Sequence, residues 1–176
     1  MLHSENITIR PMTVEDLDLF HRWMSESKYV GDYLTPELVV KDSFKENMEK
    51  MLKADKKKFC MIIDKNADKE IGIINYLQCR ASNSSLEVGQ VIAEPSARGK
   101  GYGYESLKLF VDYLFNNKTI GRIQYKTRFD NKPMIAVGEK IGFSREAVMK
   151  DFYFAEGEYK DYFLMALTRQ EWKNID

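Results

Sequence analysis

The chain has 176 residues, of which 44% are hydrophobic and 31% are charged, a balance that suits one compact domain. Its 27 lysine and arginine residues equal its 27 aspartate and glutamate residues, so it lacks the basic excess of a protein that coats nucleic acid. No apolar run has the length of a membrane helix, and the first residues show no signal-peptide pattern. We therefore expect a cytoplasmic protein that binds neither nucleic acid nor membrane.

Apolar residues alternate, or recur at helical spacing, through most of the chain. In the first half they predict a strand at 7–10, a helix capped by Thr13, an irregular segment at 27–40, a helix at 41–54, and strands at 59–63 and 71–77. In the second half they predict a strand at 86–93, a helix at 104–115, a strand at 122–128, a helix at 132–141, and strands at 143–149 and 159–167. This order predicts one domain over 1–176 of the mixed α/β (α+β) class, with helices packed on a mostly antiparallel sheet.

The two cysteines, Cys60 and Cys79, stand in apolar runs without the spacing of metal ligands. We expect reduced core thiols, with neither a disulfide nor a metal site.

The segment 91–104, VIAEPSARGKGYGY, joins a predicted strand to a predicted helix and contains three alternating glycines. Glycine permits positive φ and close backbone approach. The first N–H groups of the helix have no intrahelical partner and lie at the positive end of the helix dipole, so they favour an anion such as a pyrophosphate. Arg98 and Lys100 add positive charge. A tight turn without a ligand is the alternative.

Two other phosphate-binding patterns do not fit this segment. The Walker pattern fails because Glu94 stands where its first glycine belongs and Gly101 where serine or threonine belongs. The dinucleotide pattern meets Tyr104 or Ser106 where its last glycine belongs. The sequence therefore supports neither nucleoside-triphosphate hydrolysis nor NAD binding.

The run Arg98-Gly99-Lys100-Gly101-Tyr102-Gly103 matches the [QR]-x-x-G-x-[GA] pattern of the GNAT acetyltransferases. Further matching positions are Ile9-Arg10-Pro11, Glu15-Asp16-Leu17, Glu87-Val88-Gly89, Asn131, Glu139 to Phe143, Asp161-Tyr162 and Glu171-Trp172. The chain thus resembles this family over nearly its whole length, and most of all the branch with ribosomal-protein alanine N-acetyltransferases. The resemblance implies a GNAT-like fold and transfer of an acetyl group from acetyl-CoA to a primary amine.

The resemblance also implies a cofactor site. Backbone groups of Val91, Ile92 and Ala93 would pair with the pantetheine arm of acetyl-CoA. The pyrophosphate would lie on the backbone N–H groups of Arg98, Gly99, Lys100, Gly101, Tyr102, Gly103 and Tyr104. Asn131 would contact the cofactor near its thiol end, although it is equally suited to cap the helix that begins at Lys132-Pro133.

Direct attack on the thioester requires a neutral amine, and Glu87 stands where related sequences often place a glutamate that serves as general base. An exposed strand carboxylate is the alternative role of Glu87. The usual acids of the family are absent, because Gly138 replaces a tyrosine and Met134 replaces a serine. Another tyrosine or water would then protonate the thiolate. A non-catalytic regulatory module that binds acetyl-CoA is the alternative to an enzyme, and a nucleotide-binding domain of another kind is the third hypothesis.

Variable segments at 24–40, 78–85 and 150–161 are expected to build the acceptor site. They combine aromatic residues with carboxylates, which would suit a cationic amine but also occurs on ordinary surfaces. The acceptor is expected to be a small amine or a protein N-terminus. His21 is expected to be structural, and a homodimer is a family-level expectation.

Overall fold

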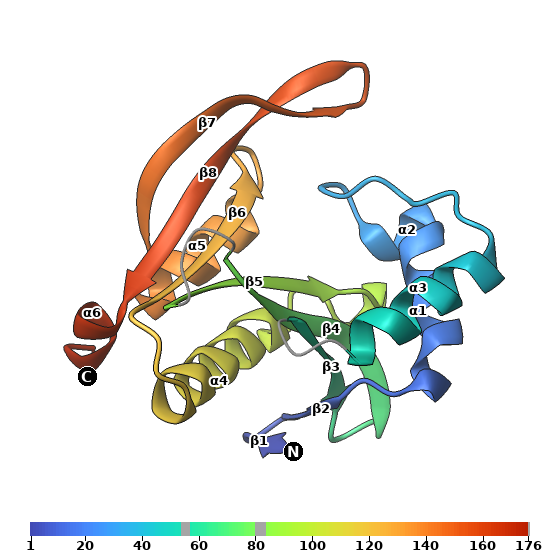
Figure 1. Cartoon of the computed structure of the whole chain (residues 1–176), viewed down its shortest axis with the longest axis horizontal. Helices are drawn as coiled ribbons and strands as arrows, with labels where there is room; N and C mark the ends of the chain where they lie inside the picture. Colours follow the sequence, from blue (N-terminus) through green and yellow to red (C-terminus); the bar gives the residue numbers. More distant parts are fainter. Residues whose placement is uncertain (54–56, 80–83, 176) are drawn as a thin grey trace. The chain divides into compact units, whose positions relative to one another are not determined.

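The computed structural model describes residues 1–53, 57–79 and 84–175 (Figure 1). Its strands are β1 (Leu2–His3), β2 (Ile7–Pro11), β3 (Lys57–Asp64), β4 (Lys69–Gln78), β5 (Ser85–Ile92), β6 (Arg122–Arg128), β7 (Ser144–Ala155) and β8 (Glu158–Thr168). Its α-helices are α1 (Leu17–Ser25), α2 (Ser27–Val30), α3 (Lys41–Lys53), α4 (Tyr102–Asn117), α5 (Lys132–Ile141) and α6 (Arg169–Lys173), with single 3-10 turns at η1 (Val14–Asp16) and η2 (Pro95–Ala97).

The eight strands follow the order β1-β2-β3-β4-β5-β6-β8-β7. The pairs β1–β2, β2–β3, β3–β4, β6–β8 and β7–β8 are antiparallel, whereas β5 and β6 run parallel. The predicted class, a mixed and mostly antiparallel sheet with helices, is confirmed. No helix in the described part of the chain is both long and apolar enough to span a membrane.

The chain forms two compact units, and each is described by itself. The first unit comprises Met1–Leu77 and Gly89–Leu109, and the second comprises Gln78–Val88 and Phe110–Asp176. Strand β5 and helix α4 each contribute residues to both units.

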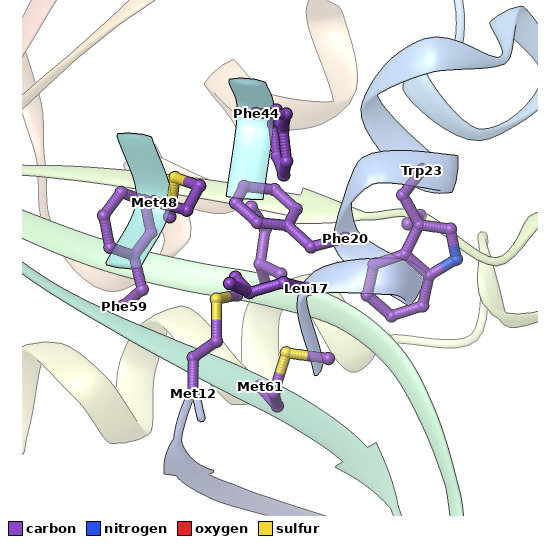
Figure 2. Close-up of a cluster of buried hydrophobic side chains, with 10 residues drawn as sticks. Met12, Leu17, Phe20, Trp23, Phe44, Met48, Phe59 and Met61 are labelled. Atoms are coloured by element: carbon purple, nitrogen blue, oxygen red, sulfur yellow. The ribbon is translucent and has the colours of Figure 1, made fainter. Parts of the chain in front are cut away.

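In the first unit, helices α1 and α3 bury their apolar side chains against one face of β3 and β4 (Figure 2). The buried members of this cluster are Met12, Leu17, Phe20, Trp23, Phe44, Met48, Phe59, Met61, Ile73 and Ala93. The entry into α1 is fixed by Asp16, whose carboxylate accepts hydrogen bonds from the backbone of Thr13 at 2.8 Å and from Arg10 at 2.6 and 2.7 Å. Thr13 therefore marks the start of this helical segment, as predicted.

In the second unit, β6 pairs along its whole length with residues 162–168 of β8, and β7 and β8 form a long hairpin (Figure 1). The turn between β7 and β8 contains Glu156 and Gly157, both with positive φ. Helix α5 has the predicted bounds because both of its ends carry strong signals. Its first turn is capped by Asn131, and Gly142 follows its last residue with a φ of 109°.

Several short elements were not predicted. Strand β1 and helices α2 and α6 were missed, so the segment 27–40 is not irregular throughout. Trp23 is buried in α1, whereas Met24 is only partly buried. The last residue of the predicted helix at 41–54, and residues 80–83 of the variable segment at 78–85, lie outside the described residues.

The two cysteines are free and half-buried, so neither is the fully buried core thiol that we expected. Burial raises the pKa of the Cys60 thiol to about 11. Such a thiol stays protonated and unreactive at neutral pH.

Candidate active site

The glycine segment of the first unit forms a backbone turn with two residues at positive φ. Gly99 and Gly101 have φ values of 74° and 88°, and a Cβ built on either would meet no other atom within 4 Å. Positive φ at alternate residues turns successive N–H groups toward a common point, as in anion-binding nests. Helix α4 begins at Tyr102, two residues earlier than predicted, so its positive N-terminal end adjoins this turn.

The hydrogen bonds of the segment show which N–H groups are available to a ligand. The N–H of Arg98 donates to the carbonyl of Pro95 at 3.2 Å, and the N–H of Glu105 donates to Gly101 at 3.0 Å. Within the described part of the chain, the N–H groups of Gly99, Lys100 and Gly101 have no protein acceptor. The expected donor set therefore loses Arg98, which already has a partner, and a pyrophosphate fits the groups that remain.

The side chain of Arg98 does not add its charge to this turn in the way we expected. Its guanidinium donates to the carbonyls of Ile92 at 3.0 Å, Ala93 at 2.9 Å and Tyr29. A Cβ at Gly31 would lie 3.3 Å from the same guanidinium. Arg98 thus joins helix α2 to the end of β5, a role that the sequence pattern does not reveal.

The third glycine of the segment has a different role. The side chain of Gln90 donates to the carbonyl of Gly103 at 2.9 Å, and a Cβ at position 103 would lie 3.2 Å from the donor nitrogen. Gly103 therefore allows α4 to approach β5 closely. The Oε1 atom of Gln90 is buried and has no hydrogen-bond partner among the described residues.

Two anchors hold the start of α4 in the first unit. The hydroxyl of Tyr102 donates to Asp64 at 2.7 Å, and Glu105 accepts from the Ser4 hydroxyl at 2.7 Å and the Asn6 N–H at 2.9 Å. Burial would raise the pKa of Glu105, but the hydrogen bonds from Ser4 and Asn6 outweigh it and lower the pKa. The carboxylate therefore stays ionised and keeps its bonds at neutral pH.

Successive residues of strand β5 direct their backbone N–H and C=O groups to opposite edges of the strand. The N–H of Ala93 donates to Ile71 of β4 at 2.9 Å, and the carbonyl of Val91 would lie 2.2 Å from a Cβ at Gly72, also on β4. Ile92 lies between them and therefore points its N–H to the opposite edge. On that edge, β5 pairs with β6 only over Ser85–Glu87 among the described residues.

In the second unit, Glu87 lies opposite Gln124 of β6 and its side chain is 23% exposed. Its Oε1 is 3.1 Å from the ammonium of Lys126, and its Oε2 accepts from the Gln124 amide at 3.4 Å. Glu87 is therefore an ion-paired carboxylate that solvent still reaches. Lys126 was missed because the register of two strands far apart in the sequence cannot be read from the sequence.

Asn131 caps helix α5, which is one of the two roles predicted for it. Its Oδ1 accepts from the N–H of Met134 at 3.2 Å, and no acceptor for its side-chain NH2 group is found among the described residues. The turn before it is held by Arg128, which is 6% exposed and donates to Asp130 at 2.8 Å. The cap leaves the NH2 group available for a ligand.

Comparison with known proteins decides the family. A family model described as acetyltransferase (GNAT) domain matches residues 6–144, more than half of the chain. The chain belongs to the GNAT acetyltransferase family. Its members transfer acetyl groups from acetyl-CoA, so the chain is an acyltransferase and acetyl-CoA is its acetyl donor.

Individual relatives span the whole chain or a part of it. An uncharacterised N-acetyltransferase p20 of Bacillus licheniformis is 26% identical over 97% of both chains. The [ribosomal protein uS5]-alanine N-acetyltransferase of Escherichia coli K12 is 28% identical over 63% of this chain and 57% of its own. A crystal structure of spermidine N-acetyltransferase from Vibrio cholerae with CoA and spermine has a TM-score of 0.86 at 21% identity, covering 97% of this chain and 100% of its own.

The structure explains why this family member has glycine at position 138. A Cβ at Gly138 would lie 1.8 Å from the hydroxyl oxygen of Tyr125, which donates to the carbonyl of Met134 at 3.2 Å. The phenol of Tyr125 thus fills the space into which a side chain at position 138 would extend. Burial raises the pKa of Tyr125, so this phenol stays protonated.

The remaining sequence expectations concern metal ions and His21. No cluster of three or more potential metal ligands is present in the described ranges. His21 Nε2 lies 2.9 Å from the carbonyl oxygen of Val39, and its ring packs edge-on against Phe44. These contacts support the structural role expected for His21.

Proposed function

We propose that this acetyltransferase transfers the acetyl group of acetyl-CoA to a primary amine, which is a protein N-terminus or a small amine. The observation that carries the proposal is the turn at Gly99 to Gly101, with its outward N–H groups and open space. Among the relatives, one is named for an alanine of a ribosomal protein, and one solved neighbour contains spermine. Both names describe amine acceptors.

For the cofactor, we propose that the N–H groups of Gly99, Lys100 and Gly101 bind the pyrophosphate together with the first turn of α4 at Tyr102, Gly103 and Tyr104. Two features of the protein support this assignment. The glycines leave space for phosphate oxygens, and the helix dipole favours negative charge at this end. Arg98 would support the site by fixing the end of β5.

The rest of the cofactor would lie along β5. Of Val91, Ile92 and Ala93, only Ile92 points its N–H away from β4, so it is the best candidate to pair with the pantetheine arm. Asn131 would donate its side-chain NH2 group near the thiol while its Oδ1 caps α5. The cap would orient the amide for that contact.

When bound, acetyl-CoA supplies an acetyl group activated as a thioester. Glu87 is the proposed general base, which would accept a proton from the attacking amine directly or through a water molecule. Its 23% exposure admits an acceptor, and Gln124 orients its second oxygen. Positions 134 and 138 carry no hydroxyl group, and the Tyr125 phenol is buried. Protonation of the leaving group is therefore assigned to water.

The cofactor site can be tested with a Gly101→Val variant. A branched side chain would disfavour a φ of 88° and enter the open space, so acetyl-CoA affinity should fall. Loss of two hydrogen bonds to a charged group, at about 1.5 kcal/mol each, corresponds to roughly a hundredfold. Isothermal titration calorimetry measures the affinity directly.

Gly157→Val is a matched control, because Gly157 also has a positive φ of 82° and open space but lies in the β7–β8 turn. It should bind acetyl-CoA as the natural chain does. Equal affinity in both variants would remove the support for the site. A thiol-release assay over peptide and small-amine acceptors tests the reaction, and saturable acetyl-CoA binding without release from any amine would indicate a regulatory module instead.

A further inference from the structure

In the second unit, a lysine of the chain itself occupies the surroundings expected of a cationic acceptor. The ammonium of Lys126 lies 3.1 Å from Glu87 Oε1 and 5.6 Å from the ring centroid of Phe152. The ring of Phe152 in turn contacts that of Tyr162 at a centroid distance of 5.2 Å. A carboxylate beside an aromatic ring is the combination that binds alkylammonium groups in proteins.

These groups are accessible to a ligand. The side chains of Glu87 and Lys126 are 23% and 31% exposed, and Phe152 is 42% exposed. The ion pair therefore lies where solvent screens it, and an incoming cation would exchange with Lys126 at modest cost.

Further positive charge lies on the same face of β6. Arg122, Lys126 and Arg128 are separated by even numbers of residues along the strand. Because successive side chains of a strand point to opposite faces, these three leave the sheet on the same side. Arg122 pairs with Glu146, and Arg128 pairs with Asp130, so both cations are held in place. Both arginines are ion-paired and Arg128 is only 6% exposed, so the repulsion of an acceptor depends on Lys126, which is 31% exposed.

We propose that Lys126 is a specificity-determining residue, a resident cation that competes with the acceptor for Glu87 and disfavours polyamines. The proposal rests on the proposed function, in which Glu87 is the base. A peptide α-amine has a pKa near 8, so it is partly neutral and needs less help from the carboxylate than an alkyl amine with a pKa above 10. Lys126 thus favours acceptors with one weakly basic amine, because it repels acceptors that carry several ammonium groups.

The test compares kcat/KM for an alanine-initiated peptide and for spermidine. Lys126→Met keeps the aliphatic length and removes the charge, which frees Glu87 and Phe152 for a substrate ammonium. The spermidine-to-peptide ratio should rise about tenfold, mainly through a lower KM for spermidine, as expected for one charge removed at short range near the surface. A lost packing contact alone would not shift the ratio between the two acceptors.

Lys173→Met is the matched control, since it removes the same charge from exposed α6 and should leave the ratio unchanged. Lys126→Gln replaces the methionine variant if that variant does not fold. An unchanged ratio in the folded Lys126 variant overturns the proposal.

If neither the natural chain nor any variant releases CoA from acetyl-CoA in the presence of an amine, the proposed function fails. Calorimetric titration with spermidine then still tests the role of Lys126. About tenfold tighter spermidine binding by the Lys126 variant supports the resident cation. Equal affinity overturns it.

Discussion

At the residue scale, the glycines of the site serve two physical purposes. Gly99 and Gly101 have positive φ and face open space, so they shape a surface for a ligand. Gly103 and Gly138 instead permit close packing, because a Cβ at either would meet a neighbouring side chain within 3.2 Å. The family pattern identifies Gly101 and Gly103, whereas the roles of Gly99 and Gly138 become clear only from the structure.

The packing role of Gly138 makes a prediction about stability. Gly138→Ala places a methyl group 1.8 Å from the Tyr125 hydroxyl, so the phenol must move and its bond to Met134 must break. The free energy of unfolding should fall by about 1–3 kcal/mol, as for other overpacked cores, and urea denaturation measures it.

Gly121→Ala is the control, because a Cβ there would meet only the Ser84 carbonyl at 4.0 Å. Adding Tyr125→Phe to Gly138→Ala should recover part of the loss, since it removes the clashing oxygen. Equal stability of the two alanine variants would contradict the steric explanation.

At the scale of elements, the proposed pyrophosphate site depends on where helix α4 begins. Its first turn presents the N–H groups, and Tyr102 and Glu105 fasten that turn to the Asp64 and Ser4 regions of the first unit. These bonds lie outside the family pattern.

Tyr102→Phe removes the 2.7 Å bond to Asp64 and should loosen the start of α4. We expect acetyl-CoA affinity to fall about fivefold, the equivalent of one hydrogen bond of roughly 1 kcal/mol, with little change in the helix content seen by circular dichroism. Tyr113→Phe, on the same helix but partly exposed, is the control. Full affinity in Tyr102→Phe would show that this anchor does not position the site.

Elements with strong local signals could be predicted from the sequence. Strand 122–128 and helix 132–141 have the expected bounds, because Asn131 and Gly142 mark the helix ends. Short elements such as β1 and α2 depend on tertiary contacts and carry no periodicity of their own. The same limit applies to the site, where the glycine turn was predicted but the pairing of Glu87 with Lys126 depends on strand register.

At the scale of the whole molecule, both units contain carboxylates held by hydrogen bonds or cations. Burial tends to raise the pKa of Asp16, but the hydrogen bonds from Arg10 and Thr13 outweigh it and lower the pKa. In the second unit, the hydrogen bond from Arg122 lowers the pKa of Glu146. Strand β5 and helix α4 belong to both units, and we propose that they make residues 1–176 a single acetyltransferase domain that unfolds in one transition.

These lowered pKa values set the direction of the pH dependence. The folded chain binds fewer protons than the unfolded chain, so protonation favours unfolding. The stabilisation is fully present above about pH 5, beyond the ordinary carboxyl range, and is lost as the pH falls through the lower folded values. Urea denaturation between pH 7 and pH 3 should therefore show a falling free energy of unfolding in a single transition.

Asp16→Asn tests whether specific carboxylates cause this fall. It removes the carboxylate that Arg10 and Thr13 stabilise, so the variant should be less stable at pH 7 and lose less stability on acidification. Glu46→Gln on the exposed side of α3 is the control and should follow the natural chain at every pH. If Asp16→Asn shows the same pH slope as the natural chain, the Arg10–Asp16 pair does not contribute to acid sensitivity. Two separate transitions would instead contradict the single domain.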